Sequence, residues 1–503
     1  MDLTLYPLGE YCDLLDKLGV LAAPLPEGLD RGRTVELVSY NSREVVPGTL
    51  FICKGAHFKP AFLADAARRG AFAYVSETPY PEIALPCIQV GDMRRTLAPL
   101  AVKYYNDPAR KLKVIGVTGT KGKSSTAYYL KHILDGLNPK GCGVISSIDT
   151  YDGVENFESH LTTPEPLELQ KHFAHAVSSG LEYVVMEVSS QALKYHRTLG
   201  TQFAAAAFLN IGTDHISPIE HPDFEDYFQS KLKIFAQAGL SCVNLDCDHG
   251  EEALSAARAG CGTVDTFSRR NPAADVFGHD VRKVGMDILF QVDAARLGGE
   301  YRLTMPGLFN VDNALAAIAV CQGLGIPREA VRAGLEKARV PGRMEVYSSK
   351  NGDVTAIVDY AHNRMSFETL FRSVREEYPG RRIAAVFGCP GKKALDRRRD
   401  LGEVSVEYSD LVVLTEEDSG EEDTVSICKE IAVHVACPCE IQPNRGEAIR
   451  RAVLSCDKPS VILITGKGAE TRQKRGLEYI DTPSDVDYAQ AFLREYDARR
   501  GRI

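Results

Sequence analysis

The sequence predicts an α/β protein made of three domains. The chain has 503 residues, which is too long for one hydrophobic core and suggests three domains of about 150 residues each. Beyond residue 111, short apolar strands alternate with helical stretches, as in mainly parallel sheets. The passage Val340-Pro341-Gly342-Arg343 has the composition of a hinge, and a second α/β unit follows it. We therefore expect domains at residues 1–110, 111–342 and 343–503.

The predicted strands are short apolar runs that end at polar residues or glycines. In open parallel sheets, ligands gather where strands end in this way. The alanine-rich run at 204–209 is expected to be a strand that is covered on both faces. A helix is expected at 60–69. The strands expected in chain order are 50–53, 73–75, 87–90, 113–117, 183–187, 204–210, 241–245, 356–359, 383–387, 411–415 and 461–465.

The strand at 113–117 leads into a glycine-containing turn and then into a helix. The apolar face of this helix carries Ala127, Leu130, Ile133 and Leu134. A strand, a glycine turn and a helix N-terminus form a phosphate cradle, because backbone N–H groups and the positive helix end face the anion. The glycine spacing is shorter than in the usual G-x-x-x-x-G-K-[ST] pattern, so a plain surface turn is the alternative. The residues expected around the phosphates are Gly119, Thr120, Lys121, Gly122, Lys123, Ser124 and Ser125.

A magnesium site is expected beside this loop. In the phosphate-loop pattern, Lys123 reaches the β/γ-phosphates and Ser124 offers its hydroxyl to Mg²⁺. Glu187 closes the strand at 183–187, where it can act as a hard oxygen ligand or pair with a lysine. His215 follows the strand at 204–210 and is a candidate second metal contact, and Lys231 lies on a predicted helix. A loop histidine usually bonds locally and a lone helix lysine is usually solvated, so the order of these residues carries the hypothesis.

Composition narrows the class of protein. The net charge of −9 argues against a nucleic-acid surface. The thirteen cysteines are scattered, odd in number and without a C-x-x-C pair, which favours reduced thiols. The first residues lack the basic and apolar regions of a signal peptide, and no apolar run approaches the roughly 18 residues needed to span a bilayer. We expect a cytoplasmic protein without nucleic-acid or membrane partners.

Taken in order, these motifs resemble the Mur ligase family, which builds the peptide stem of bacterial cell-wall precursors. Within the family, the sequence is most similar to the enzymes that add the third amino acid. The resemblance extends over essentially the whole chain. The segments that carry it are Asn41-Ser42-Arg43, Leu161-Thr162-Thr163-Pro164-Glu165, Met186-Glu187-Val188-Ser189-Ser190-Gln191, Tyr195-His196-Arg197, Thr213-Asp214-His215, Asn310-Val311-Asp312-Asn313-Ala314, Val340-Pro341-Gly342-Arg343-Met344-Glu345, Asp359-Tyr360-Ala361-His362-Asn363 and Gly466-Lys467-Gly468.

The resemblance implies an ATP-dependent ligase reaction. The free γ-carboxylate of D-glutamate in UDP-N-acetylmuramoyl-L-alanyl-D-glutamate attacks the γ-phosphate of ATP and gives an acyl phosphate. The amine of an incoming diamino acid then displaces phosphate. Such a reaction needs Mg²⁺ and lysines to neutralise the triphosphate and the developing charge. The resemblance further implies a UDP-binding N-terminal domain, a central P-loop ATPase domain, a Rossmann-like C-terminal domain that closes over the site, and a monomer.

The resemblance also implies individual roles. Glu187 and His215 match metal ligands, and Lys231 matches a carbamylated lysine that binds a second Mg²⁺. This modification requires a partly desolvated amine, so that the neutral form can react with CO₂. Contacts to ATP are implied for Asn313, Arg343 and Asp359. Contacts to the UDP-muramyl dipeptide are implied for Ser42, His57, Phe58, Lys59, Thr162, Thr163, Ser189, Tyr195 and Arg197.

The segment expected to select the amino acid departs from the best-known family pattern. Members that add meso-diaminopimelate carry Asp-Asn-Pro-Arg there, whereas this chain has Glu417, Asp418, Ser419 and Gly420. An arginine fork would clamp the distal carboxylate of diaminopimelate, whereas a loop dense in carboxylates would attract the ammonium of lysine. We expect L-lysine, with diaminopimelate or ornithine as alternatives and a solvated acidic loop as the structural alternative. Further amino-acid contacts are expected at Arg398, Gly466 and Glu470.

Other functions fit the residues less well. A folylpolyglutamate synthase shares the phosphate loop and the modified lysine, but that enzyme begins almost directly with its ATPase domain. A non-catalytic subunit would be expected to have lost Lys123, Glu187, His215 or Lys231, and all four are present. A P-loop GTPase would carry an Asn-Lys-x-Asp tetrad after the loop, and this sequence has none.

Overall fold

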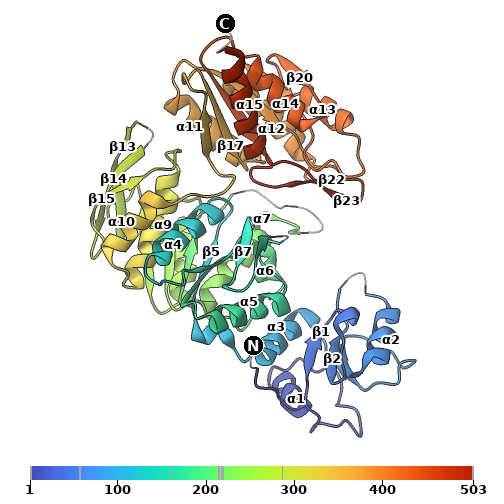
Figure 1. The fold of residues 1–503 in the computed structure, drawn as a ribbon. Helices are drawn as coiled ribbons and strands as arrows, with labels where there is room; N and C mark the ends of the chain where they lie inside the picture. The colour runs from blue at the N-terminus through green and yellow to red at the C-terminus, as the bar shows by residue number, and fades with distance from the viewer. Residues whose placement is uncertain are drawn as a thin grey trace.

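The protein consists of three lobes, each built around its own sheet. The computed structural model describes residues 3–55, 58–159, 161–212, 216, 220–285 and 287–500. Figure 1 shows the lobes following one another in chain order, with the N-terminal lobe at one end and the C-terminal lobe at the other. The α/β class predicted from the sequence is confirmed. No helix in these described ranges is long and apolar enough to cross a membrane.

The N-terminal lobe has a small parallel sheet in the order β1-β2-β3-β4. Helix α2 occupies Pro60–Arg69, the range expected from the sequence, because Pro60 stands at its first turn and the left-handed Gly70 ends it. The strands are β1 (Leu37–Ser39), β2 (Thr49–Ile52), β3 (Ala71–Ser76) and β4 (Cys87–Gln89), and the other helices are α1 (Leu8–Lys17) and α3 (Met93–Tyr104).

The central lobe has a long sheet in the order β15-β14-β13-β12-β11-β10-β5-β9-β6-β7-β8. It is parallel from β13 to β6, and the pairs at both ends are antiparallel. The strands are β5 (Lys113–Thr118), β6 (Gly143–Ile145), β7 (Asp149–Tyr151), β8 (Asn156–Glu158), β9 (Tyr183–Glu187), β10 (Ala205–Phe208), β11 (Ser241–Asn244), β12 (Val264–Ser268), β13 (Val276–Val284), β14 (Asp287–Ala294) and β15 (Gly299–Leu303).

Helices cover both faces of the central sheet. On β10, Ala205 and Ala207 belong to one apolar core while Ala206 and Phe208 belong to the other, and all four are fully buried. Small side chains on this strand allow helices to pack closely on both faces, as the alanine-rich run predicted. The helices are α4 (Lys123–Asp135), α5 (Pro166–Ser179), α6 (Ser190–Lys194), α7 (Phe224–Leu232), α8 (Gly250–Gly260), α9 (Asn310–Gly323) and α10 (Arg328–Lys337).

The C-terminal lobe has a sheet in the order β16-β17-β21-β18-β19-β20, parallel except for β16. Its strands are β16 (Glu345–Ser348), β17 (Val354–Asp359), β18 (Arg382–Phe387), β19 (Leu411–Leu414), β20 (Cys439–Ile441) and β21 (Ser460–Thr465). A separate hairpin is formed by β22 (Arg472–Arg475) and β23 (Glu478–Asp481). The helices are α11 (Arg364–Glu377), α12 (Asp396–Tyr408), α13 (Thr424–Ala432), α14 (Arg445–Leu454) and α15 (Asp485–Arg500).

Each strand expected from the sequence is present, with ends displaced by at most two residues. The expected strand at 204–210 is the most shortened, because the ladder of β10 covers only Ala205–Phe208. Strands β1, β6 to β8, β12 to β16 and β20 and the β22–β23 hairpin were not predicted from the sequence. In β13 and β14, buried and more exposed residues alternate, as is typical of an antiparallel edge that is covered on one face only.

Candidate active site

The predicted phosphate loop lies between β5 and α4 and is fixed by Asn210, which follows β10. The side chain of Asn210 accepts a hydrogen bond from the N–H of Lys121 (2.8 Å) and donates one to the carbonyl of Lys121 (3.1 Å). The carbonyl of Asn210 accepts from the N–H of Thr120 (3.1 Å). Nζ of Lys123 donates to the carbonyls of Gly119 (3.0 Å) and Thr120 (3.2 Å), so that the lysine folds back over the loop.

Two glycines allow the loop to lie close to its neighbours. Gly119 has φ +155° and Gly122 has φ +84°, backbone conformations that residues with a Cβ rarely adopt. A Cβ on Gly122 would stand 2.2 Å from Oδ1 of Asn313, and one on Gly119 would stand 2.9 Å from Cβ of Leu209. Asn313 comes from α9 and is held by a hydrogen bond to Asn310 (3.0 Å). The loop therefore keeps a bare backbone cradle at the N-terminus of α4, which fits a phosphate group.

Two predicted metal ligands are brought together by Ser147, which follows β6. The hydroxyl of Ser147 lies 3.3 Å from Oγ of Ser124 and 3.2 Å from Oε1 of Glu187, and its N–H donates to the same Oε1 (2.9 Å). Glu187 is 1% exposed. No described cationic side chain pairs with it, so the alternative of a lysine ion pair has no counterpart there. A buried carboxylate is costly without a cation, so this donor set fits a divalent metal.

Helix α7 brings Lys231 against the phosphate loop. Lys231 is 2% exposed, its Nζ donates to the carbonyl of Gly119 (3.0 Å), and Nζ lies 4.7 Å from the ring centre of Tyr227. One turn earlier on α7, the hydroxyl of Tyr227 lies 3.0 Å from Oγ1 of Thr120. Lys231 is thus a buried amine beside the loop, not a solvated surface lysine. The expected contact at His215 lies outside the described residues.

The linker between the central and C-terminal sheets reaches the same loop. Arg343 donates to Oγ of Ser124 (3.2 Å) and lies over the ring of Tyr360 (4.3 Å). Asp359, at the end of β17, accepts hydrogen bonds from the N–H groups of Met344 (2.9 Å) and Ala361 (2.8 Å). Burial raises the pKa of Asp359, and the nearby Arg343 opposes that rise. The nucleotide contacts predicted at Arg343 and Asp359 therefore adjoin each other, and the arginine touches the first turn of α4.

Several residues predicted to contact the muramyl dipeptide lie on one side of Glu187. Oγ1 of Thr163 donates to the carbonyl of Glu187 (2.9 Å) and accepts from the N–H of Ser189 (3.0 Å). Arg197 donates to the carbonyl of Thr163 (3.1 Å) and pairs with Glu165 (2.8 Å). Thr163 is buried. The threonine, serine and arginine thus form one hydrogen-bonded group next to Glu187.

The contacts predicted in the N-terminal lobe lie apart from that group. Ser42 begins a short 3₁₀ helix that packs near α2, whose N-terminus is preceded by Lys59. Phe58 packs against Phe62 and Tyr80, with ring centres 6.2 and 5.7 Å apart. Three predicted positions remain. Thr162 directly precedes Thr163, and the guanidinium carbon of Arg94 lies 3.8 Å from the ring centre of Tyr195. His57 lies outside the described residues.

The predicted amino-acid pocket is a network of buried charges. Glu417 is 7% exposed and stands against Gly466, where an added Cβ would come within 2.2 Å of its carboxylate. Burial raises the pKa of Glu417 to about 7, against the lowering effect of nearby cations that include Lys467. Lys467 pairs with Asp418 (3.0 Å) and with Glu470. The alternative of a solvated acidic loop is wrong for Glu417.

Three other predicted contact residues, Arg398, Ser419 and Gly420, have partners within the protein itself. Arg398 donates to both carboxylate oxygens of Glu422 (2.8 and 2.7 Å) and to Glu430 (2.5 Å). Its fork is therefore occupied by acidic side chains of the chain itself. Ser419 is buried, and Gly420 joins the hairpin through its N–H, which donates to the carbonyl of Lys474 (3.0 Å).

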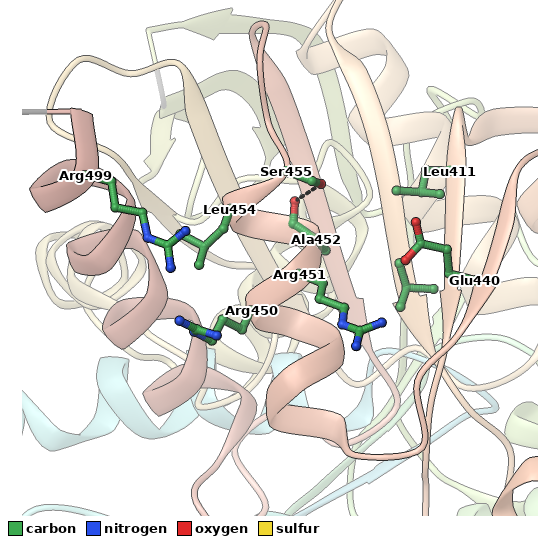
Figure 2. Close-up of a pocket in the computed structure, with 9 residues that line it drawn as sticks. Leu411, Glu440, Arg450, Arg451, Ala452, Leu454, Ser455 and Arg499 are labelled. Carbon is green, nitrogen blue, oxygen red and sulfur yellow. Dashed lines mark hydrogen bonds between the residues drawn. The ribbon is translucent and has the colours of Figure 1, made fainter. Parts of the chain in front are cut away.

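A groove of about 370 Å³ lies elsewhere on the C-terminal lobe, between α14, α15 and the β19–β20 edge (Figure 2). Arg450 and Arg499, on its helical wall, both bond to Glu495. Its sheet side includes Leu411, the first residue of β19, so it reaches the amino ends of the strands. The predicted site residues follow the carboxyl ends, where open parallel sheets bind ligands. The groove is separate from the candidate active site.

Four residues that contact the candidate site were given no individual role from the sequence. Ser147 and Lys467 follow strands, which is a usable signal, but only the sheet order brings them beside Glu187 and Asp418. Tyr227 is one helical turn from Lys231, and its role depends on the packing of α7. Lys54 bonds to Glu165 across the first two lobes, a contact that no local pattern indicates.

Two family profiles and several relatives match this chain. The profile of the Mur ligase middle domain matches residues 117–321, and that of the Mur ligase glutamate ligase domain matches residues 342–468. A relative from Enterococcus faecalis, named UDP-N-acetylmuramoyl-L-alanyl-D-glutamate–L-lysine ligase, is 39% identical over 473 residues and is covered to 92%, as is this chain. A relative of the same name from Streptococcus thermophilus is 36% identical over 466 residues, with 92% of this chain and 94% of the relative covered.

Solved structures share the fold over the whole length. The structure of a UDP-N-acetylmuramoyl-L-alanyl-D-glutamate–2,6-diaminopimelate ligase superposes with a TM-score of 0.67 at 21% identity, covering 99% of this chain and all of the other. MurF from Thermotoga maritima, solved in complex with ADP, gives a TM-score of 0.63 at 18% identity and covers 93% and 99% of the two chains. From the matched profiles and the relatives that span the chain, we conclude that the protein belongs to the Mur ligase family.

Proposed function

We propose that this protein is the ATP-dependent ligase that joins L-lysine to the γ-carboxylate of D-glutamate in UDP-N-acetylmuramoyl-L-alanyl-D-glutamate. The reaction proceeds through an acyl phosphate and belongs to peptidoglycan synthesis. The observation that carries the proposal is the meeting of Lys231, Ser124 and Glu187 at one phosphate loop. The names of relatives that are 36–39% identical over 92% of the chain support the same substrates.

ATP is assigned to the loop at 119–122 and the first turn of α4. Backbone N–H groups and the helix N-terminus bind the phosphates there, and Lys123 leaves the loop carbonyls to reach the terminal phosphates. Arg343 and Asp359 are assigned to the nucleotide from the linker side, and Asn313 from α9. The ADP-bound MurF of the same fold supports nucleotide use.

Mg²⁺ is assigned to Ser124 and Glu187, with His215 as a further expected ligand. The fit rests on Glu187, whose second carboxylate oxygen accepts no hydrogen bond from the described residues. Bound Mg²⁺ would neutralise the triphosphate and the charge that develops on phosphoryl transfer. Ser147 keeps the carboxylate oriented by donating two hydrogen bonds to one of its oxygens.

Lys231 is proposed to carry a carbamate. The neutral ε-amine attacks the carbon of CO₂, an N–C bond forms, and the nitrogen loses one proton to water. Burial of the side chain supports this step, because burial disfavours the charged ammonium and frees the lone pair. The product is an anion beside the loop that can bind a second Mg²⁺.

The acidic substrate is assigned to Thr163, Ser189 and Arg197. These groups adjoin Glu187, so a D-glutamate carboxylate held there would be close to the phosphate loop. Orientation at this point would speed the reaction, since a well-placed carboxylate attacks the phosphorus far faster than a free one. Ser42, His57, Phe58 and Lys59 of the N-terminal lobe, with Thr162 and Tyr195, are assigned to the UDP-sugar part.

L-lysine is assigned to the carboxyl-end edge of the C-terminal sheet. Glu416 pairs with Arg475, Asp418 pairs with Lys467, and Glu417 forms no ion pair among the described residues. Glu417 is therefore the carboxylate best suited to receive the side-chain ammonium. Release of Arg398 from its two glutamates would be needed before it could bind the α-carboxylate.

A coupled assay tests this function. Purified protein with ATP, Mg²⁺ and UDP-N-acetylmuramoyl-L-alanyl-D-glutamate is given L-lysine, L-ornithine or meso-diaminopimelate, and phosphate release and product mass are measured. We expect rapid phosphate release only with a diamino acid, and the highest kcat/KM with lysine. Preference for diaminopimelate or ornithine would overturn the lysine assignment. Absence of turnover with all three would overturn the ligase assignment itself.

A further inference from the structure

A second group of metal-binding side chains lies outside the residues assigned to the ligase reaction. It consists of Asp152, Glu155, His172 and His175, and one ligand atom from each lies within 4.8 Å of the others. The histidines are one turn apart on α5, and the carboxylates belong to the turn between β7 and β8. Asp152, His172 and His175 are 1%, 5% and 7% exposed. Burying polar or charged side chains such as these is costly unless hydrogen bonds, opposite charges or a metal ion compensate them.

Four hydrogen bonds orient the carboxylate of Asp152. Its Oδ1 accepts hydrogen bonds from the N–H groups of Val154 (2.9 Å) and Glu155 (2.7 Å). Its Oδ2 accepts from Nδ1 of His172 (2.7 Å) and Nδ1 of His175 (2.8 Å). Both imidazoles therefore point their Nδ1 atoms at one carboxylate oxygen.

The spacing suits a small divalent metal. Ligands about 2.1 Å from a tetrahedral zinc ion stand roughly 3.4 Å from one another. The two His–Asp contacts, now 2.7 and 2.8 Å, would widen by about 0.6–0.7 Å, and Oε2 of Glu155, now 3.9 Å from Nδ1 of His172, would move closer by about 0.5 Å. Two imidazole nitrogens and two carboxylate oxygens are a set that zinc accepts.

We propose that Asp152, Glu155, His172 and His175 form a structural Zn²⁺ site. Zinc binds each neutral ring at Nδ1, so the proton on Nδ1 leaves and Nε2 takes one up, while the two carboxylates balance the charge of the ion. Four protein ligands complete a tetrahedron and leave no position open for a substrate, which is the property of structural sites. The inference is independent of the proposed ligase function.

The site would fasten a part of the central lobe that touches both other lobes. On α5, Glu168 bonds to Tyr40 of the N-terminal lobe. On β8, Glu158 accepts a hydrogen bond from Thr471 of the C-terminal lobe (3.0 Å). Zinc would join α5 to the β7–β8 hairpin between these two contacts, and so fix the distance between the elements that carry them.

Metal binding by the full-length protein tests the site. The protein is stripped with a chelator, dialysed free of Mg²⁺ and titrated with Zn²⁺ alone by calorimetry. We expect one Zn²⁺ per chain, an affinity at least 100-fold lower in His175→Ala, and an affinity within tenfold of wild type in His175→Cys, since a thiolate replaces the lost ligand. His249→Ala is the matched control, because His249 is an exposed histidine of the same lobe whose Nδ1 lies 2.8 Å from Oε1 of Glu252. The Zn²⁺ affinity of this variant should equal that of the wild type.

Spectroscopy separates this site from the thirteen cysteines. Co²⁺ in place of Zn²⁺ should give the visible bands of tetrahedral nitrogen and oxygen ligation in the wild-type protein, without thiolate charge-transfer bands. Circular dichroism establishes that both His175 variants are folded. The proposal is overturned if no Zn²⁺ binds, if His175→Ala binds as tightly as wild type, or if thiolate bands appear in wild type. Addition of millimolar Mg²⁺ should leave the Zn²⁺ affinity unchanged, and competition would also contradict the site.

Discussion

At the scale of single residues, we propose that the ligase reaction depends on the buried amine of Lys231. Nζ of Lys231 is enclosed beside the carbonyl of Gly119 and the ring of Tyr227. We expect Lys231→Ala and Lys231→Arg both to lower kcat, on the order of 100-fold or more. Arginine keeps the positive charge and the hydrogen bond to the loop, but its guanidinium cannot form a carbamate.

Phosphate release under saturating substrates measures this effect, and ¹³C NMR in labelled bicarbonate detects the carbamate directly. Lys233→Ala is the control, since Lys233 is exposed and lies two residues along the chain. An arginine variant within threefold of the wild-type kcat would remove the carbamate from the mechanism. If Lys231→Ala lowered kcat only by destabilising the fold, its melting temperature would fall together with its kcat.

Glu417 gives a pH dependence at the same scale. Its pKa is raised to about 7 by burial, so the carboxylate is mostly neutral at pH 6 and mostly ionised at pH 8. Only the ionised form attracts the side-chain ammonium of lysine. The ratio of wild-type to Glu417→Gln kcat/KM for lysine should therefore rise about tenfold from pH 6 to pH 8. Taking the ratio cancels the titration of the attacking α-amine, which is common to both proteins.

The matched control for this experiment is Glu421→Gln. Glu421 is in the same acidic segment but is exposed, and its pKa is lowered by the hydrogen bond to Lys392. The ratio of wild type to this variant should stay flat between pH 6 and pH 8. A flat ratio for Glu417→Gln as well would mean that another group recognises the ammonium.

Which residues could be foreseen depends on what fixes their position. Glu187 could be predicted, because a strand-end carboxylate beside a phosphate loop is set by the local pattern of one strand. Ser147 could not, because its contact with Glu187 follows from β6 pairing with β9 across the sheet. Arg398 was expected to face a ligand, and nothing local indicates that Glu422 and Glu430 occupy its fork.

At the scale of elements, the turn between β5 and α4 depends on backbone geometry. Gly122→Ala would strain a residue at φ +84° and press a methyl group against Asn313, at 2.2 Å. We expect the KM for ATP to rise roughly tenfold, because a side chain held in this conformation costs about 1–2 kcal/mol and the cradle must shift to relieve the contact. Lysine and muramyl substrates should keep their KM values.

Gly285→Ala separates backbone strain from the shape of the cradle. Gly285 has φ +65° and open space around its Cβ position, so it has the conformational cost without the clash. Its variant should lower the melting temperature slightly and leave the KM for ATP unchanged. Equal kinetic behaviour of the two variants would show that the cradle tolerates a methyl group.

Elements were predictable to the degree that their signals are local. The bounds of α2 are set by Pro60 and Gly70, and those of β9 by an apolar run that ends at Glu187, so both were found to the residue. The β13–β15 edge was missed, because half-polar strands such as β13 become stable only when they pair with one another and pack on α9. Long-range pairing carries that information, and a single segment does not.

At the scale of the whole molecule, the lobes are joined by a few specific contacts. Lys283 on β13 pairs with Glu377 at the end of α11 (3.0 Å), and the carboxylate of Glu377 also accepts from the N–H of Gly307 (3.0 Å). The side chain of Glu377 is 1% exposed. The three-lobed division could be expected from chain length and the hinge at 340–343. The contacts between lobes could not, because residues far apart in sequence form them.

Lys283→Ala should loosen the C-terminal lobe. It leaves the buried carboxylate of Glu377 without its cation, at a cost of about 1–2 kcal/mol, a value reduced because other hydrogen bonds remain and Lys283 is partly exposed. The population with separated lobes should then rise about 5–30-fold.

Trypsin cleavage after Arg343 reports this opening, since Arg343 is covered by its contacts with Ser124 and Tyr360. Lys393→Ala removes an exposed lysine of the same lobe and should cleave like wild type. If Lys283→Ala also cleaves like wild type, other contacts hold the lobes together, and the docking of α11 on the central sheet edge does not depend on this ion pair.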